Sequence, residues 1–104
     1  MILYNVTFQV DSDIETQWTN WVQKTYIPKM LSDNGFSSAQ LLRVRTEEGT
    51  ITGSYALQFS AADQKQFDHY MTQNSAIHRQ EILEQFGTKA LIFSTQLEII
   101  STHQ

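Results

Sequence analysis

The sequence predicts an α+β domain in which a four-stranded antiparallel sheet carries its helices on one face. Four segments have apolar residues at every second position, which is the period of a strand with one buried face. Two segments between them carry apolar residues at helical spacing, and a length of 104 residues suits one domain, residues 1–104. With 40% hydrophobic and 17% charged residues, the chain is predicted to fold around a core.

The first strand and the first helix lie before Gly35. Residues 2–10 alternate between apolar and polar side chains, which predicts a strand. Polar side chains at 11–13 can cap a helix, and the apolar residues that follow share one helical face: Ile14, Trp18, Trp21 and Val22. Because Pro28 has no backbone N–H, this helix should end or kink near Tyr26, with Pro28 as an alternative start of a further turn through Leu31, and residues 33–35 should close the region.

Three further strands are predicted after Gly35. Residues 36–46 and 51–59 are rich in β-forming side chains, and the four residues 47–50 between them include a Gly. This length and composition suit a tight turn, so the two strands should pair as an antiparallel hairpin. Residues 90–99 alternate again and are expected to form the last strand.

A second helical region is expected over residues 61–86. Residues 60–63 resemble a capping box with Asp in place of Glu, and Gly87 supplies a stop signal. The polar tetrad 72–75 shifts the apolar phase, so a break is expected there with Ser75 as the cap of the restarted helix. The predicted core face carries Phe67, Tyr70, Met71, Ile82, Leu83 and Phe86.

The resulting order, βαββαβ, is that of the ferredoxin-like fold, in which both right-handed crossovers place their helices on the same face of the sheet. The other face is predicted to mix polar and apolar side chains: Leu3, Asn5, Thr7, Gln9, Leu41, Arg43, Ser54, Ala56, Gln58, Ile92, Ser94, Gln96 and Glu98. This face is too apolar for ordinary surface, and an identical chain related by a two-fold axis is the simplest partner.

A homodimer is therefore predicted, with its sheets packed together. The candidate interface residues are Leu3, Asn5, Leu41, Arg43, Ala56, Gln58, Ile92, Gln96 and Glu98. Among them, Arg43 could meet Glu98 across the sheet or in the partner chain. Exposed ion pairs of this kind contribute only about 0–1 kcal/mol.

Several short stretches of the chain carry a resemblance to a known family: Tyr4-Asn5-Val6-Thr7, Trp18-x-x-Trp21, Ile27-Pro28, the 55–59 strand, Gln85-Phe86-Gly87 and Thr95-x-Leu97-Glu98. In this order the chain resembles a family of small bacterial proteins known as a domain of unknown function. That family is similar to the dimeric α/β-barrel, ferredoxin-like superfamily, which includes cofactor-independent antibiotic-biosynthesis monooxygenases and haem-binding members. The resemblance implies a fold and a dimer, and it implies no particular chemistry.

The resemblance also directs attention to Tyr26, because relatives commonly have His at this position. A phenol has a pKa near 10 and replaces imidazole poorly as an acid or base near neutral pH. Around this position the aromatic residues allow two interpretations: Trp18 and Trp21 either belong to the core or line a pocket for a planar ligand. The candidate pocket residues are Trp18, Trp21, Tyr26, Tyr70, His69 and His78.

The histidines are expected on a solvated helix face. His78 and Glu81 have the i, i+3 spacing that could present two metal ligands, but three His and no Cys supply too few ligands for a complete site. We therefore predict no metal. Neither a dinucleotide fingerprint nor a phosphate-binding Gly-rich loop is present, so no cofactor is expected.

The composition also limits the class of partner. Seven Lys and Arg residues are scattered against 11 Asp and Glu, giving a net charge of −4, so no nucleic acid is expected to bind. No apolar run approaches the roughly 18 residues of a membrane span, and a cytoplasmic location is expected.

Two functional hypotheses remain open at this stage. The chain is either a binding or interaction module, or a cofactor-independent enzyme, monooxygenase-like or isomerase-like, with its pocket between the helices and the sheet. A filled space between these layers would favour the module, whereas an open cavity of roughly 300 Å³ or more with converging polar groups would favour the enzyme.

Overall fold

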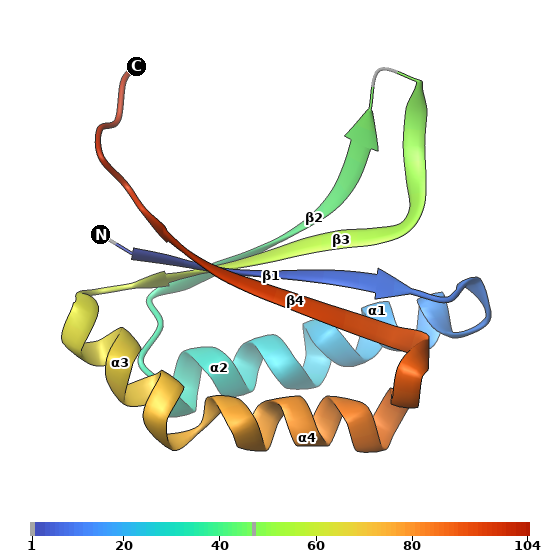
Figure 1. The fold of residues 1–104 in the computed structure, drawn as a ribbon, viewed down its shortest axis with the longest axis horizontal. Helices are drawn as coiled ribbons and strands as arrows, with labels where there is room; N and C mark the ends of the chain where they lie inside the picture. The colour runs from blue at the N-terminus through green and yellow to red at the C-terminus, as the bar shows by residue number, and fades with distance from the viewer. Residues whose placement is uncertain (1, 47) are drawn as a thin grey trace.

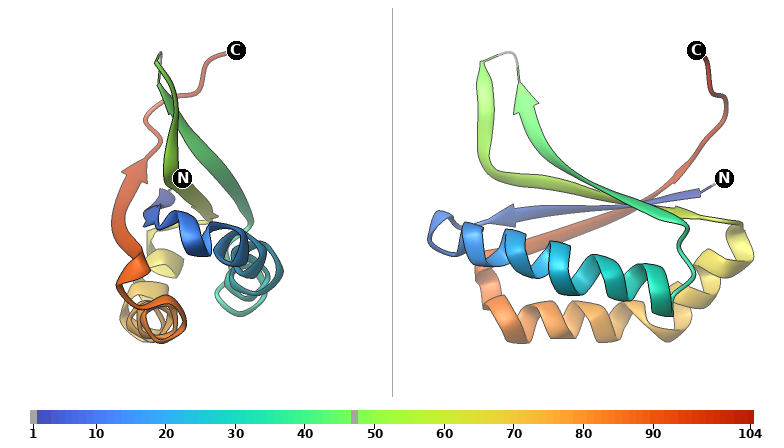
Figure 2. Two further views of the ribbon diagram at one scale, coloured as in Figure 1. Left: turned by 90° about the vertical axis from the view of Figure 1, so that its right-hand side faces the viewer. Right: turned by 180° about the vertical axis from the view of Figure 1, so that it is seen from behind.

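The computed structural model describes residues 2–46 and 48–104, and it has the ferredoxin-like architecture that the sequence predicts (Figure 1). One antiparallel sheet, in the strand order β2-β3-β1-β4, is formed by β1 (Ile2–Val10), β2 (Ser38–Thr46), β3 (Gly49–Ala61) and β4 (Ala90–Glu98). Its helices are α1 (Glu15–Trp21), α2 (Ile27–Asp33), α3 (Gln64–Gln73) and α4 (Ser75–Phe86). All four helices cover the same face of the sheet (Figures 1 and 2).

The first helical region runs without interruption from α1 to α2. A π-helical segment, Val22–Tyr26, joins the two, and Pro28 lies in the first turn of α2. The helix therefore changes its hydrogen bonding just before Pro28, the residue that lacks an N–H. It does not end near Tyr26, and the alternative turn at Pro28 is present and extends to Asp33. The predicted core face is confirmed, since Trp18 and Val22 are fully buried.

The second helical region breaks where the polar tetrad predicted it. Asn74 separates α3 from α4 and takes the capping position, whereas the Ser75 hydroxyl donates a hydrogen bond to the Met71 carbonyl at 2.9 Å. At the start of α3 the carboxylate of Asp63 accepts a hydrogen bond from the Gln66 backbone N–H at 2.8 Å. The cap of α3 is Asp63, the last residue of the predicted capping box. The cap of α4 is Asn74, one residue before the predicted Ser75.

The core between sheet and helices is built mainly from aromatic rings. Tyr4 lies within 5.4 Å of Phe67 and 5.6 Å of Tyr70, measured between ring centroids. At the other end of the sheet the Trp18 ring lies 4.9 Å from Phe8 and 4.8 Å from Tyr55. Met71 and Leu83, which the helical pattern assigned to the core face, are exposed instead.

The strand register decides which side chains face the helices. Directly opposed residues of an antiparallel pair point to the same side of the sheet. Leu41 is opposite the buried Leu57, and Arg43 is opposite the buried Tyr55. Both therefore face the helices, and the prediction that placed them on the other face is wrong.

The last strand shows the same inversion. Ile92 is opposite the buried Phe8, Gln96 is opposite the buried Tyr4, and Glu98 is opposite the buried Ile2. Ile92 packs against the core, and Ser94 accepts a hydrogen bond from an α4 arginine. The predicted placement of Ile92, Ser94, Gln96 and Glu98 on the other face is therefore also wrong.

We call the side of the sheet away from the helices the outer sheet face. Its members, fixed by the register, are Leu3, Asn5, Thr7, Gln9, Ser38, Gln40, Leu42, Ser54, Ala56, Gln58, Ser60, Leu91, Phe93, Thr95 and Leu97. Of the predicted interface residues, Leu3, Asn5, Ala56 and Gln58 lie on this face.

The β2–β3 hairpin leaves the plane of the sheet and rises on the side of the outer sheet face, as does the chain after β4 (Figures 1 and 2). Gly53 lies where β3 leaves β1, with φ +80°, and an added Cβ there would be 2.2 Å from the Val10 carbonyl oxygen. Of the predicted connection, residue 47 is outside the described residues, while Gly49 already belongs to β3. No helix in the described part of the chain is long and apolar enough to cross a membrane.

Candidate functional site

The predicted pocket residues fall into three places. Tyr26, Tyr70 and His78 are buried together, with the His78 ring centroid 6.1 Å from Tyr26 and 5.7 Å from Tyr70. Trp18 is buried apart from them, against Phe8 and Tyr55. His69 is exposed on α3.

Trp21 borders the buried group. It is half-buried, stacks on Tyr26 at 5.4 Å and contacts Phe86 edge-on at 5.3 Å. Side chains therefore fill the space between helices and sheet around Tyr26. This agrees with the interpretation that Trp18 and Trp21 belong to the core. His78, expected on a solvated helix face, is buried, because the α4 face that contains Ile82 and Phe86 also contains position 78.

The buried hydroxyls form a small polar cluster within this core. A hydrogen bond joins Tyr70 to His78 Nδ1 at 3.2 Å, and the Tyr26 ring lies edge-on to the His78 ring. Burial, more than any neighbouring charge, raises the pKa of Tyr26 and of Tyr70 well above the ordinary tyrosine range. Both phenols thus stay neutral near neutral pH.

The residues considered for a metal are engaged elsewhere. Glu81 forms an ion pair with Lys29 at 3.0 Å, which ties α4 to α2. Within residues 2–46 and 48–104 no group of three or more His, Cys, Asp or Glu side chains is placed to hold a metal ion.

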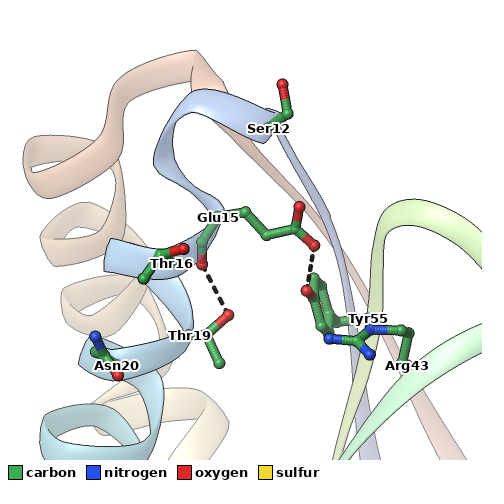
Figure 3. A pocket seen from close by; sticks show the side chains of 7 residues that line it. All are labelled: Ser12, Glu15, Thr16, Thr19, Asn20, Arg43 and Tyr55. Atoms are coloured by element: carbon green, nitrogen blue, oxygen red, sulfur yellow. Dashed lines mark hydrogen bonds between the residues drawn. The ribbon is translucent and has the colours of Figure 1, made fainter.

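An open polar pocket lies at the other end of the helical layer, between the start of α1 and strands β2 and β3 (Figure 3). It has a volume of about 420 Å³ and is lined by Ser12, Glu15, Thr16, Thr19, Asn20, Arg43 and Tyr55. The Tyr55 hydroxyl donates a hydrogen bond to Glu15 Oε2, and the Thr19 hydroxyl donates one to the Glu15 carbonyl oxygen at 2.7 Å. The Arg43 guanidinium carbon lies 5.7 Å from the centre of the Tyr55 ring.

Sequence reasoning missed this pocket for two reasons. Its helical residues form the polar side of α1, which reads as ordinary solvated surface: Glu15, Thr16, Thr19 and Asn20. In addition, Arg43 was assigned to the opposite side of the sheet. Correct pairing of Arg43 with Tyr55 would have placed a cation beside the start of α1.

The outer sheet face carries large apolar side chains in the open. Phe93 is 64% exposed, Leu91 49%, Leu97 41% and Leu42 39%. Its polar members bond mainly within the face: the Asn5 side-chain amide donates to Thr95 Oγ1 at 3.4 Å, and Gln58 Nε2 donates to Asn5 Oδ1 at 3.3 Å. A row of apolar side chains beside an internally bonded polar patch is typical of a surface that another protein covers.

The comparison with protein families decides the chain's membership. Residues 1–100 match the family described as "Domain of unknown function (DUF4286)". The chain belongs to this family. The family resemblance found in the sequence is thereby confirmed, and the match is to a family without an assigned activity. No curated protein matches the chain by sequence.

Solved structures with the same fold are distant in sequence. A Deinococcus radiodurans protein provisionally assigned as an antibiotic biosynthesis monooxygenase aligns with TM-score 0.72 at 7% identity, over 100% of this chain and 97% of its own. A dimeric ferredoxin-like protein from an uncultured marine organism aligns with TM-score 0.71 at 11% identity, over 98% of this chain and 96% of its own. A second dimeric ferredoxin-like protein from an uncultured marine organism gives TM-score 0.66 at 14% identity, over 99% and 97%. These structures confirm the ferredoxin-like fold.

Proposed function

We propose that the protein is a homodimeric binding or interaction module whose two copies pack through their outer sheet faces. The observation that carries this proposal is the apolar row formed by Leu91, Phe93 and Leu97, with Leu42 on the opposite edge strand. We keep the dimer predicted from the sequence but change its interface. The apolar row replaces the predicted interface residues that face the helices, which are Leu41, Arg43, Ile92, Gln96 and Glu98.

The energy of burial supports a partner on this face. A large apolar side chain that stays in water forgoes about 1.5–3 kcal/mol of burial. A second copy carries an identical apolar row, and a two-fold axis places the same surface of both copies in contact, so the two rows can cover each other. The β2–β3 hairpin and the chain after β4 both rise on the side of the outer sheet face (Figure 2).

Two of the similar structures are described as dimeric, which supports the same assembly here. The chain after β4 adds further apolar surface beyond the sheet, since Ile100 is almost fully exposed. Burial of this residue in the dimer would extend the contact past the end of β4.

The enzyme hypothesis has less support. A monooxygenase-like or isomerase-like reaction at the predicted pocket residues needs an open cavity around them, and buried rings including Trp18, Tyr26 and Tyr70 fill that space. The open pocket of about 420 Å³ beside the start of α1 contains none of the predicted pocket residues. The raised pKa of both tyrosines also makes them poor acid–base groups near neutral pH.

Sedimentation of matched variants tests the proposal. Phe93→Lys puts a charge into the apolar row of the proposed interface, whereas Ile77→Lys puts the same charge at a similarly exposed apolar residue of α4. We expect the wild type and Ile77→Lys to sediment as dimers and Phe93→Lys to sediment as a folded monomer. Ala56→Lys, on a central strand of the same face, is the second variant if Phe93→Lys does not fold. A dimer that survives both substitutions on the outer sheet face would contradict the proposal.

A further inference from the structure

The geometry points to a binding site for a small zwitterion, carrying one carboxylate and one ammonium group, in the polar pocket between α1 and strands β2 and β3 (Figure 3). A free amino acid or a dipeptide has this chemistry. The pocket lies on the helical side of the sheet, so the site is independent of the proposed dimer interface.

The carboxylate end of the ligand is assigned to Arg43. Among the described side chains, no carboxylate lies within 4.0 Å of this guanidinium, although its position over the Tyr55 ring holds it at the pocket wall. An arginine presents a planar fork of donors that matches a carboxylate with two parallel hydrogen bonds. Arg43 is therefore an available cation whose natural partner would come from a ligand.

The ammonium end is assigned to Glu15. This side chain is half-buried, and the Tyr55 hydroxyl bonds to Oε2, which fixes the carboxylate at the pocket wall. A carboxylate offers about four lone-pair sites, so Oε1 and the remaining sites of Oε2 can accept bonds from an ammonium group. Tyr55 thus positions both charged groups, one by a hydrogen bond and one by its ring.

The presence of Arg43 and Glu15 in one pocket determines which charges the ligand should carry. A simple anion is attracted by Arg43 and repelled by Glu15, and a simple cation meets the reverse. A zwitterion in one orientation satisfies both. The charges are close enough to share a pocket of about 420 Å³, yet no ion pair joins them directly.

The rest of the lining favours a small polar molecule. Hydroxyl groups of Ser12, Thr16 and Thr19 and the amide of Asn20 can bond to the peptide or side-chain groups of the ligand. The volume falls in the range of small-molecule sites, about 300–1,000 Å³. An amino acid or a dipeptide fits this size.

Titration of the full-length, isotope-labelled protein with L-alanine and with alanyl-alanine, followed by amide NMR, tests the site. We expect saturable shifts at Thr16, Thr19, Asn20 and Arg43. N-acetylated and C-amidated alanyl-alanine each lack one of the two charges, and each should bind about tenfold or more weakly than the free dipeptide.

Variants provide an independent check. Arg43→Gln and Glu15→Gln should each weaken binding of the free dipeptide about tenfold or more, while Arg45→Gln, on the same strand but outside the pocket, should leave it unchanged. The amide spectra report whether each variant is folded. Should Glu15→Gln unfold, the capped dipeptides still test the ammonium contact in the wild type.

Three results would overturn the assignment. They are the absence of saturable shifts with both probes, equal binding of capped and free dipeptides, and shifts confined to residues outside the pocket. Phe93→Lys is expected to keep the site, so a failed site and a failed dimer give different results in the two experiments.

Discussion

Substitution of Gly53 by Ala tests how the chain leaves the sheet to form the projecting hairpin. Gly53 has φ +80°, and an added Cβ would lie 2.2 Å from the Val10 carbonyl oxygen. A side chain at positive φ costs about 1–2 kcal/mol. Because the close contact is with backbone, β3 must also move from β1, and losing a cross-strand hydrogen bond costs about 0.5–1.5 kcal/mol more. The expected total is about 1.5–3.5 kcal/mol of unfolding free energy.

Gly87→Ala is the matched control. Gly87 also has a positive φ, +60°, but an added Cβ there meets no atom within 4 Å. With ψ −142° its backbone is in a region that glycine alone adopts readily, so the control should lose about 1–3 kcal/mol from the backbone conformation alone. Urea denaturation of both variants, followed by far-ultraviolet circular dichroism, measures the difference. Equal stability of the two would refute the claim that close approach to Val10 requires glycine at position 53.

Three other substitutions test the core and the loop after β1. Trp18→Ala should lower the unfolding free energy by about 3–5 kcal/mol in urea denaturation, because a fully buried ring is lost; wild-type stability would disprove the packing of α1. Tyr26→His should keep the fold but cost about 1–3 kcal/mol, measured in the same way; an unfolded variant would contradict this. Hydrogen bonding to Lys89 lowers the pKa of Asp13, so this pair adds stability above the ordinary Asp pKa of about 3.9, and that stability is lost as the pH falls through the lowered value. Lys89→Gln should raise the Asp13 pKa in an NMR titration, and an unchanged pKa would contradict the assigned cause.

The helical and central-strand parts of the fold could be predicted from the sequence because in each the more apolar side faces the core. The i, i+4 spacing of Trp18 and Val22 identified the buried side of α1. On β1 the apolar residues at even positions are buried as expected. In both elements the apolar side chains lie on the core side, so periodicity alone was sufficient.

The edge strands misled the same reasoning, for a physical reason. The alternation of side chains shows which residues share a face of a strand. To decide which face packs against the helices, we assumed that it is the more apolar one. On β4 the more apolar set, including Phe93 and Leu97, points away from the helices, while Ser94 and Gln96 bond to polar side chains of the helical layer. A strand that is more apolar on its outer side contradicts a monomer in water and agrees with a sheet that a partner covers.

The polar pocket could not be predicted because its charges come from separate elements. Glu15 and Arg43 are far apart in the sequence, and the β3 residue Tyr55 brings them together. No spacing rule links a residue at the start of a helix to an edge strand. The register of β2 against β3 was the information that the sequence lacked.

Intermolecular nuclear Overhauser effects in a mixed dimer test the central claim most directly. One copy carries isotope labels and the other does not, so filtered spectra report contacts between copies alone. The proposed dimer predicts contacts from the Phe93 ring, Leu91 and Leu97 to side chains of the partner's outer sheet face. Contacts restricted to helical residues such as Ile77, or a chain that sediments at 12.0 kDa with no contacts at all, would contradict it.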